Sequence, residues 1–308
     1  MPKPPERVNV PTRPVEYVQD PCTVFPEDRC GDLCVALEAA LLGGHATWPH
    51  YRSGSLRTEE KRPGDPVTEA DHASNRAVLA LLATRRPSDR VLSEESPPPT
   101  GDCGGRLWVV DPLDGTREFI DGIDEFAVMV GLAESGAAAL GAVYVPGSGL
   151  LYAGLASGGA WRAECEPVLD SGPMTVGSFE SLTVGSPAAG VTRLVRSRSH
   201  PDPVLQEIES ELPGAVAIPS GSVGVTCARI AERGADLYVH PVPYLKEWDT
   251  CAPEAILKGA GGRVTDCGGG PLQYGKEGPR QPRGILAGDP KSWAAALPLV
   301  RRLAASIL

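Results

Sequence analysis

The chain has 308 residues, of which 42% are apolar and 22% charged, and its 39 acidic residues against 29 basic ones give a formal charge of −10. At roughly 150 residues per domain this length predicts about two domains, and the acidic balance argues against non-specific binding to a nucleic-acid backbone. No apolar run approaches the ~18–20 residues of a membrane-spanning helix, and the first residues lack the apolar core of a secretory signal peptide.

The eight cysteines predict reduced thiols, because they form no CxxC pair and a chain of this length needs no disulfide staples. We therefore expect a cytoplasmic protein. Cys30 and Cys34 lie four residues apart and could share a metal ion. No matching histidine or cysteine pair lies nearby, which favours buried packing instead.

The first half of the chain begins with an arm and two helices. Residues 1–26 contain seven prolines and little periodicity, which predicts an extended arm. Leucines at helical spacing predict a helix over residues 30–42, and the polar segment 53–65 predicts a loop or hairpin. Thr68 is a good N-cap for a second helix that reaches about Arg85.

Strands follow the second helix. The apolar run 107–110 predicts a buried strand that ends at Asp111. Three further runs, over 126–130, 141–145 and 150–153, are separated by Gly, Ser and Pro turns, which predicts an antiparallel meander.

The second half alternates between strands and helices, which is typical of an α/β arrangement. We expect strands over 192–196, 216–218, 236–240, 263–265 and 284–287. We expect helices over 203–211 and 249–259 and from 289 onward, and a further helix that follows the strand over 216–218 and ends at about residue 233. An irregular stretch precedes these elements, so the predicted units are the arm over 1–26, a first domain over 27–185 and a second over 186–308.

The stretch from Asp111 to Thr116, Asp-Pro-Leu-Asp-Gly-Thr, is the most informative in the chain. A buried strand delivers Asp111 and Asp114 into a turn, and the carbonyl of Leu113 between them can point the same way. Hard oxygen ligands of this kind suit Mg²⁺ or Ca²⁺. Free backbone N–H groups at Gly115 and Thr116 would form an anion site where a helix opens. A plain Asp-rich turn is the structural alternative.

Four more acids lie at the ends of predicted elements. Glu94 and Glu95 follow a short apolar segment, and Asp71 and Asp249 lie in the first turns of helices. Each by itself is as expected for a solvated acid or an N-terminal helix residue. Their joint significance depends on whether they meet in space.

Three of these stretches together resemble a known superfamily. Glu94-Glu95, Asp111 to Thr116 and Trp248-Asp249 occur in the order found in the lithium-sensitive, magnesium-dependent phosphatases that include inositol monophosphatase and fructose-1,6-bisphosphatase. The resemblance covers roughly residues 30–290. It implies an α+β fold, a layered α-β-α-β-α sandwich with an antiparallel sheet in the N-terminal half and an α/β C-terminal half.

Within that superfamily the chain is most similar to the 3′(2′),5′-bisphosphate nucleotidases, including the bacterial CysQ type. The stretches that carry this likeness are 111–119, 196–200, 248–254 and 261–266. It implies Mg²⁺-dependent hydrolysis of the 3′-phosphate of 3′-phosphoadenosine 5′-phosphate to give AMP and phosphate, and it allows action on the 3′-phosphate of its 5′-phosphosulfate. Inositol monophosphatase or another small phosphate-ester phosphatase is the alternative, and a non-catalytic nucleotide- or metal-binding relative ranks below both.

The resemblance also implies a metal site in the crevice between the two domains. One Mg²⁺ would be held by Glu94, Asp111 and the Leu113 carbonyl, and a second by Asp111, Asp114 and Asp249. Asp71 would reach a third through water and orient Thr116, so that Asp71, Thr116 and Glu94 form the catalytic group. Two or three Mg²⁺ ions per site and inhibition by Li⁺ follow from the same likeness.

Substrate contacts are implied at the second domain. The amides of Gly115 and Thr116 would bind the scissile phosphate, and Ser199, His200, Gly221 and Ser222 would face the nucleoside or its other phosphate. His200 can equally be an ordinary loop histidine. The partner is thus a small phosphorylated nucleotide, with no nucleic-acid polymer and no membrane, and the protein is expected to be a monomer or homodimer.

The chain departs from the nucleotidase pattern at one position. Family nucleotidases usually carry a lysine in the helix after the Gly-Ser segment, where this chain has Thr226. Arg198 or Arg229 would have to supply that positive charge.

Overall fold

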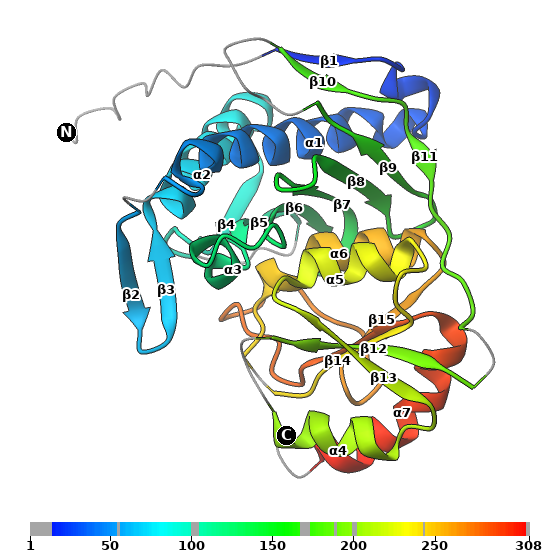
Figure 1. Cartoon of the computed structure of the whole chain (residues 1–308). Coiled ribbons are helices and arrows are strands. Elements are labelled where there is room, and N and C mark those ends of the chain that lie inside the picture. The colour runs from blue at the N-terminus through cyan, green and yellow to red at the C-terminus, as the bar shows by residue number, and fades with distance from the viewer. Residues whose placement is uncertain are drawn as a thin grey trace.

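The computed structural model describes residues 14–53, 56–99, 105–166, 173–187, 190–198, 202–242 and 244–305. Its elements stack in five layers, helix–sheet–helix–sheet–helix, from top to bottom in Figure 1. This arrangement confirms the predicted α-β-α-β-α sandwich. No helix in the described part of the chain has the length and apolar character needed to cross a bilayer.

The first sheet has seven strands in the order β11-β9-β8-β7-β6-β5-β4. Their bounds are β4 (Arg90–Ser93), β5 (Arg106–Asp114), β6 (Ala127–Glu134), β7 (Ala137–Val145), β8 (Leu150–Leu155), β9 (Ala160–Glu164) and β11 (Glu180–Ser181). Strands β5 to β9 pair antiparallel in succession, which confirms the predicted meander. Helices cover both faces, and strands buried on both faces are expected to be apolar along their whole length.

Two helices, α1 (Glu27–Thr47) and α2 (Glu69–Arg85), form the outer layer on this sheet. Helix α1 extends beyond the predicted 30–42 and is followed by the 3-10 turn η2 (Trp48–His50). Gly43 and Gly44 are the residue type that often ends a helix, but here both pack tightly against side chains of the neighbouring helix and strands and the helix continues.

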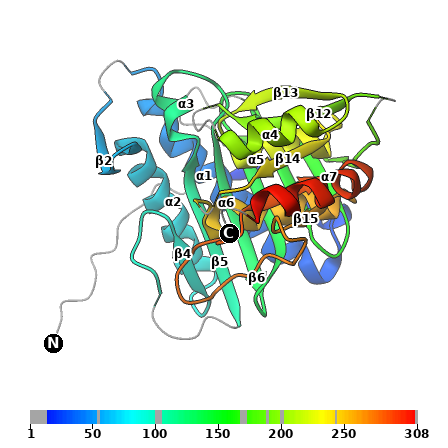
Figure 2. The same cartoon turned by 90° about the horizontal axis from the view of Figure 1, so that it is seen from below.

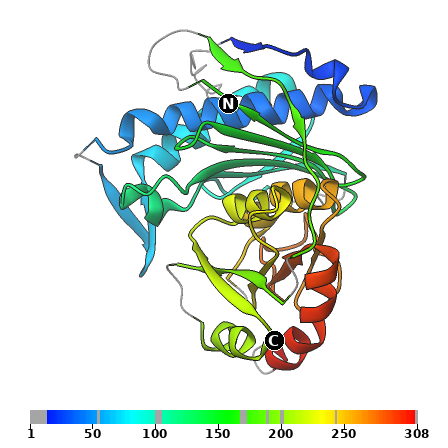
Figure 3. The same ribbon diagram turned by 45° about the vertical axis from the view of Figure 1, so that its right-hand side comes forward.

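Two further helices, α5 (Val223–Ala231) and α6 (Glu247–Gly259), lie between the two sheets (Figure 3). Helix α6 crosses strands that carry glycine at the contact. A Cβ atom on Gly141 of β7 would lie 2.5 Å from the Cα atom of Ala252, so only glycine lets the helix approach this closely. The two halves of the chain therefore share this middle layer.

The second sheet has the order β13-β12-β14-β16-β15. Its strands are β12 (Thr192–Ser197), β13 (Ala215–Ser220), β14 (Leu237–His240), β15 (Arg263–Thr265) and β16 (Ile285–Gly288). Helices α4 (Pro203–Glu211) and α7 (Pro290–Ala304) cover its outer face and lie side by side nearest the viewer in Figure 2. The alternating order of elements predicted for the second half is confirmed.

Two short strand pairs lie outside these sheets. The polar segment forms a hairpin of β2 (Thr58–Arg62) and β3 (Asp65–Thr68), which projects from the start of α2 in Figure 1. The N-terminal strand β1 (Val15–Tyr17) pairs parallel with β10 (Met174–Val176). Of the predicted arm over 1–26, residues 1–13 lie outside the described residues.

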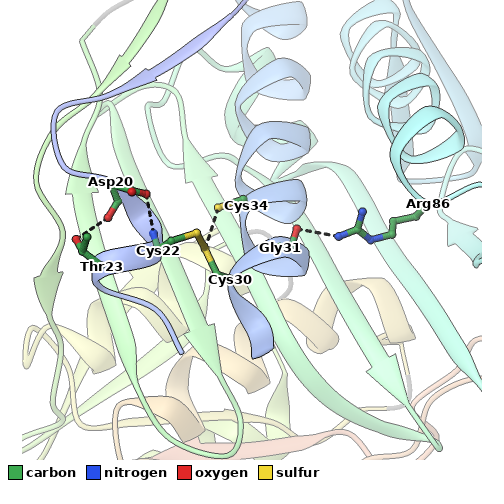
Figure 4. The surroundings of a disulfide bond; sticks show 7 residues. All are labelled: Asp20, Cys22, Thr23, Cys30, Gly31, Cys34 and Arg86. Atoms are coloured by element: carbon green, nitrogen blue, oxygen red, sulfur yellow. Dashed lines mark hydrogen bonds between the residues drawn. A yellow bond between two sulfur atoms is a disulfide. The ribbon is translucent and has the colours of Figure 1, made fainter. Parts of the chain in front are cut away.

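The prediction that all cysteines are reduced is wrong for one pair. Cys22 and Cys30 form a disulfide that ties the 3-10 turn η1 (Pro21–Thr23) to the first turn of α1 (Figure 4). Because its sulfur is bonded to Cys22, Cys30 does not share a metal ion with Cys34, whose Sγ atom lies 3.8 Å from that of Cys30. Sequence spacing missed the bond because its two cysteines meet only where the chain folds back before the helix.

Candidate active site

Strand β5 places Asp111 and Asp114 at its end. Against β6, Asp111 pairs with Met129 and Asp114 with Ala127, so three steps on β5 face two on its neighbour. This bulge allows two carboxylates at an odd spacing to turn toward the same side, which a regular strand would not. Gly115 follows with φ of 90°, a left-handed conformation that glycine adopts without strain, and the short helix α3 (Thr116–Ile120) begins.

Asp71 contacts this turn through the Thr116 side chain. One carboxylate oxygen of Asp71 accepts hydrogen bonds from the backbone N–H of Thr68 at 2.8 Å and from its hydroxyl at 2.7 Å. The other oxygen lies 3.1 Å from the Thr116 hydroxyl, which lies equally far from the Leu113 carbonyl. Asp71 is therefore fixed by the capping box of α2, and its second carboxylate oxygen orients Thr116.

Asp249 enters from the opposite helix. It lies in the first turn of α6, where the backbone N–H of Lys246 donates to its Oδ2 atom over 2.6 Å. Asp114 is held in a similar way, because the Ser222 hydroxyl donates to its Oδ2 atom at 2.6 Å and the Gly224 N–H at 2.8 Å. The starts of two middle-layer helices thus converge on the end of β5.

Glu94 and Glu95 follow strand β4. The backbone N–H of Glu94 donates to the Val110 carbonyl over 3.2 Å, which keeps Glu94 beside β5. The ammonium of Lys61, from the β2–β3 hairpin, lies 2.9 Å from Glu94 Oε1 and also bonds Glu95. The polar segment 53–65 was predicted as a loop or hairpin, and its residue pattern does not show that Lys61 reaches across to these acids.

Burial concentrates negative charge at this point. Burial, and secondarily the charges of Glu94 and Asp114, raises the pKa of Asp111 well above its ordinary value. Burial also raises the pKa of Asp249 well above its ordinary value. For Asp114 burial raises the pKa to about 7, although two hydrogen bonds favour its charged form. Such a cluster favours protons or cations.

The donor set fits a hard divalent cation. Carboxylates and a main-chain carbonyl are the ligands that Mg²⁺ prefers, and the buried charge of Asp111 and Asp249 has no cationic side-chain partner among the described hydrogen bonds. In the described ranges, no three acidic, histidine or cysteine side chains are already arranged around a common point at metal-binding geometry. Each acid is instead held by a protein donor, so cation binding would require small side-chain movements.

The expected substrate residues are placed in part. Ser222 contacts Asp114 directly, and Gly221 packs so closely on Glu118 that a Cβ atom would overlap its carboxylate. Ser199 and His200 lie outside the described residues. Glu118, a residue the sequence analysis did not assign, is buried and pairs with Arg198 at 3.3 Å.

Arg198 belongs to an ion network next to the turn. Its guanidinium lies 2.7 Å from Glu125, which also pairs with Arg229 at 3.0 Å. The backbone of Glu125 packs against Gly115, where a Cβ atom would lie 3.0 Å from the Glu125 carbonyl oxygen. Thr226 is buried, and its hydroxyl donates to the Ser222 carbonyl within α5. The two arginines are therefore the positive charges nearest to Gly115 that these contacts identify.

Comparison with known proteins places the chain among phosphatases. The CysQ 3′(2′),5′-bisphosphate nucleotidase of Escherichia coli K12 is 37% identical over 216 residues, which cover 70% of this chain and 81% of that protein. The mouse 3′(2′),5′-bisphosphate nucleotidase 1 is 29% identical over 245 residues, or 69% of this chain and 75% of the mouse protein.

Solved structures share the fold. CysQ from Bacteroides thetaiotaomicron superposes with a TM-score of 0.67 at 30% identity and covers 83% of this chain and 96% of its own. The suhB protein of Bartonella henselae superposes with a TM-score of 0.72 at 23% identity, over 88% and 98% of the two chains, a likeness of fold alone. The model of the inositol monophosphatase family matches residues 33–302. The chain belongs to the inositol monophosphatase family.

Proposed function

We propose that the protein is a Mg²⁺-dependent 3′(2′),5′-bisphosphate nucleotidase. It hydrolyses the 3′-phosphate of 3′-phosphoadenosine 5′-phosphate to give AMP and phosphate, and that of the corresponding 5′-phosphosulfate to give adenosine 5′-phosphosulfate and phosphate. The observation that carries the proposal is the convergence of Asp71, Asp111, Asp114 and Asp249 with the Gly115–Thr116 turn. The 37% identity to CysQ of Escherichia coli supports the substrate class.

The residues fit a metal-assisted hydrolysis. Asp111, the Leu113 carbonyl and Glu94 would hold one Mg²⁺, and Asp111, Asp114 and Asp249 a second, with a third near Asp71. When bound, these ions would neutralise the phosphate dianion and lower the pKa of a bound water. We include Li⁺ inhibition in the proposal, since Li⁺ would replace one of them.

The chain's own groups position the reacting atoms. The N–H groups of Gly115 and Thr116, at the start of α3, would donate to the phosphoryl oxygens as charge builds there. The Thr116 hydroxyl, held by Asp71 at 3.1 Å, would accept a hydrogen bond from the attacking water and pass a proton toward the Asp71 carboxylate. Water adds its oxygen to phosphorus as the bond to the 3′-oxygen breaks in line, without a covalent enzyme intermediate.

The second phosphate of the substrate needs a positive partner. Arg198 and Arg229 both pair with Glu125, whose carbonyl oxygen packs against Gly115, and we propose that they reach the second phosphate from there. Guanidinium groups bind phosphate through paired charge-assisted hydrogen bonds. We propose that these arginines supply the charge absent at Thr226 and that Ser199, His200 and Gly221 contact the nucleoside.

The remaining parts of the proposal follow from the same chemistry. The partner is a small phosphorylated nucleotide rather than a nucleic-acid polymer or a membrane, because the chain is acidic overall and its positive charges are local. We propose a cytoplasmic enzyme that works as a monomer or homodimer, in which Cys22 and Cys30 are bonded while the other described cysteines are free thiols.

The test is phosphate release in the presence of Mg²⁺. Adenosine 3′,5′-bisphosphate, inositol 1-phosphate and histidinol phosphate are compared by kcat/KM, since a histidinol-phosphatase of Chlorobaculum parvum is also a relative, 37% identical over 131 residues. The nucleotide should be the best substrate. A higher kcat/KM for the inositol ester would replace the nucleotidase proposal with inositol monophosphatase.

A further inference from the structure

The ammonium group of Lys61 contacts the carboxylate cluster, which consists of Glu94, Glu95, Asp111, Asp114 and Asp249. It lies 2.9 Å from Glu94 Oε1 and bonds Glu95 as well, and its side chain is only 25% exposed although its strand lies on the surface. Glu95 is 5% exposed in this pairing. A lysine side chain on an exposed strand loses rotamer freedom when it is held by two acids. Its ion pairs with Glu94 and Glu95 have to offset that entropic cost.

Lys61 is the basic side chain that meets the cluster. Among the described hydrogen bonds, Asp111, Asp114 and Asp249 are held by backbone N–H groups or by a serine hydroxyl. Lys246, the other base at the site, directs its ammonium to the Tyr244 carbonyl instead. The positive charge that balances Glu94 therefore comes from Lys61.

Among the described ion pairs, no other basic residue of the β2–β3 hairpin contacts Glu94 or Glu95. Arg62, the next residue of β2, pairs with Asp65 across the hairpin at 3.0 Å. At the turn, the Gly64 carbonyl accepts a hydrogen bond from Arg117 over 2.6 Å. Lys61 is thus the link between β2 and the cluster, and Arg62 offers a neighbouring charge that leaves the cluster untouched.

We propose that Lys61 is a built-in counter-ion that competes with the divalent cation for Glu94. It stabilises the protein without metal by pairing with a carboxylate that is otherwise crowded by other acids, and it weakens metal binding because Glu94 has to exchange a lysine for the cation. The described acids are gathered but not arranged as a ready ligand group, which agrees with this exchange. The inference rests on the proposed metal dependence and not on the identity of the substrate.

The experiment measures metal affinity rather than turnover. Mg²⁺ is titrated by calorimetry into the full-length metal-free protein as wild type, K61Q, K61R and R62Q, and each variant's thermal midpoint is measured in EDTA. K61Q should bind Mg²⁺ about three- to tenfold more tightly and have a lower midpoint in EDTA. K61R, which keeps the charge, and R62Q should retain the wild-type Mg²⁺ affinity.

The outcomes separate two kinds of failure. Unchanged or weaker Mg²⁺ binding by K61Q overturns the counter-ion role, because loss of a merely structural contact would not tighten metal binding. If the wild type binds no Mg²⁺ at all, the proposed function itself fails. K61A provides a second neutral variant with a shorter side chain, and it should show the same tighter binding as K61Q.

Discussion

The Thr116 hydroxyl lies 3.1 Å from Asp71, whose other oxygen is held by both the backbone and the side chain of Thr68. One buried carboxylate therefore connects the cap of α2 with the start of α3. Because three donors converge on it, the carboxylate has little freedom to rotate. The Thr116 side chain bonded to it is therefore also held in one position.

Removing this hydroxyl should slow catalysis more than it weakens binding. T116V keeps the shape of the side chain but can neither hold the water nor pass on its proton, so kcat should fall by about 10²–10⁴ while KM changes little. Steady-state kinetics with adenosine 3′,5′-bisphosphate measure the effect. T84V, which removes an exposed hydroxyl bonded only to the Ala80 carbonyl, serves as the control. A T116V enzyme with wild-type kcat would remove Thr116 from the mechanism.

The arginine pair at Glu125 should determine selectivity for two phosphates over one. R229Q should reduce kcat/KM for adenosine 3′,5′-bisphosphate by about tenfold or more and leave hydrolysis of adenosine 3′-monophosphate nearly unchanged. R162Q is the control, since Arg162 likewise pairs with glutamates, Glu180 and Glu232, but lies on β9, which three strands separate from β5 in the sheet order. Equal losses for both substrates would indicate a structural role for Arg229.

Magnesium affinity should rise with pH across neutrality. Burial raises the pKa of Asp114 to about 7, above the value of 3.8 expected when unfolded, so the folded protein without metal binds the extra proton. The stability from this group is complete below about pH 4 and is lost as pH rises through about 7. Mg²⁺ needs the deprotonated carboxylate, so its Kd should decrease from pH 6 to pH 8.

Two measurements check this dependence. Calorimetric titrations at several pH values give the Mg²⁺ affinity and the protons released, and thermal melts in EDTA give the stability without metal. The melts should show a lower midpoint at pH 8 than at pH 5. An affinity that does not depend on pH would mean that Asp114 is already ionised without metal.

The Cys22–Cys30 bond should contribute to stability without a direct effect on catalysis. It closes a short loop, and in the loop-entropy model a loop of this length contributes about 2–3 kcal/mol. Wild type in a reducing agent, and C22S without it, should therefore unfold at lower urea concentration than oxidised wild type. C34S should retain the oxidised stability, and peptide mapping should recover the 22–30 cross-link. Recovery of a 30–34 cross-link instead would contradict the described pairing.

The order of elements and the central motif were predictable because both are local. Apolar runs and helical spacing define the strands around β5 and the helices that cover them, and the Asp-Pro-Leu-Asp-Gly-Thr turn carries its chemistry within six residues. The bulge that turns Asp111 and Asp114 to one side depends on the register with β6, which no local pattern specifies.

Contacts between distant residues were not predictable in the same way. Ser222 meets Asp114 across 108 positions, and Lys61 meets Glu94 across 33. Ser222 was expected to face the substrate, and Lys61 lies in a segment predicted only as a loop or hairpin. A single sequence shows the type of each side chain but not which one lies opposite. The disulfide was missed for the same reason, since Cys22 approaches Cys30 only through the fold of η1.

Gly141 connects packing with chemistry over a distance. The closeness of α6 to the first sheet depends on the missing side chain at this position, and α6 carries Asp249 about one turn before Ala252, the residue that Gly141 contacts. The separation between Asp249 and the acids of β5 thus depends on how closely α6 packs against the first sheet. An alanine at Gly141 would push α6 away from the first sheet and so displace Asp249, a proposed metal ligand, without contacting any of the proposed site residues.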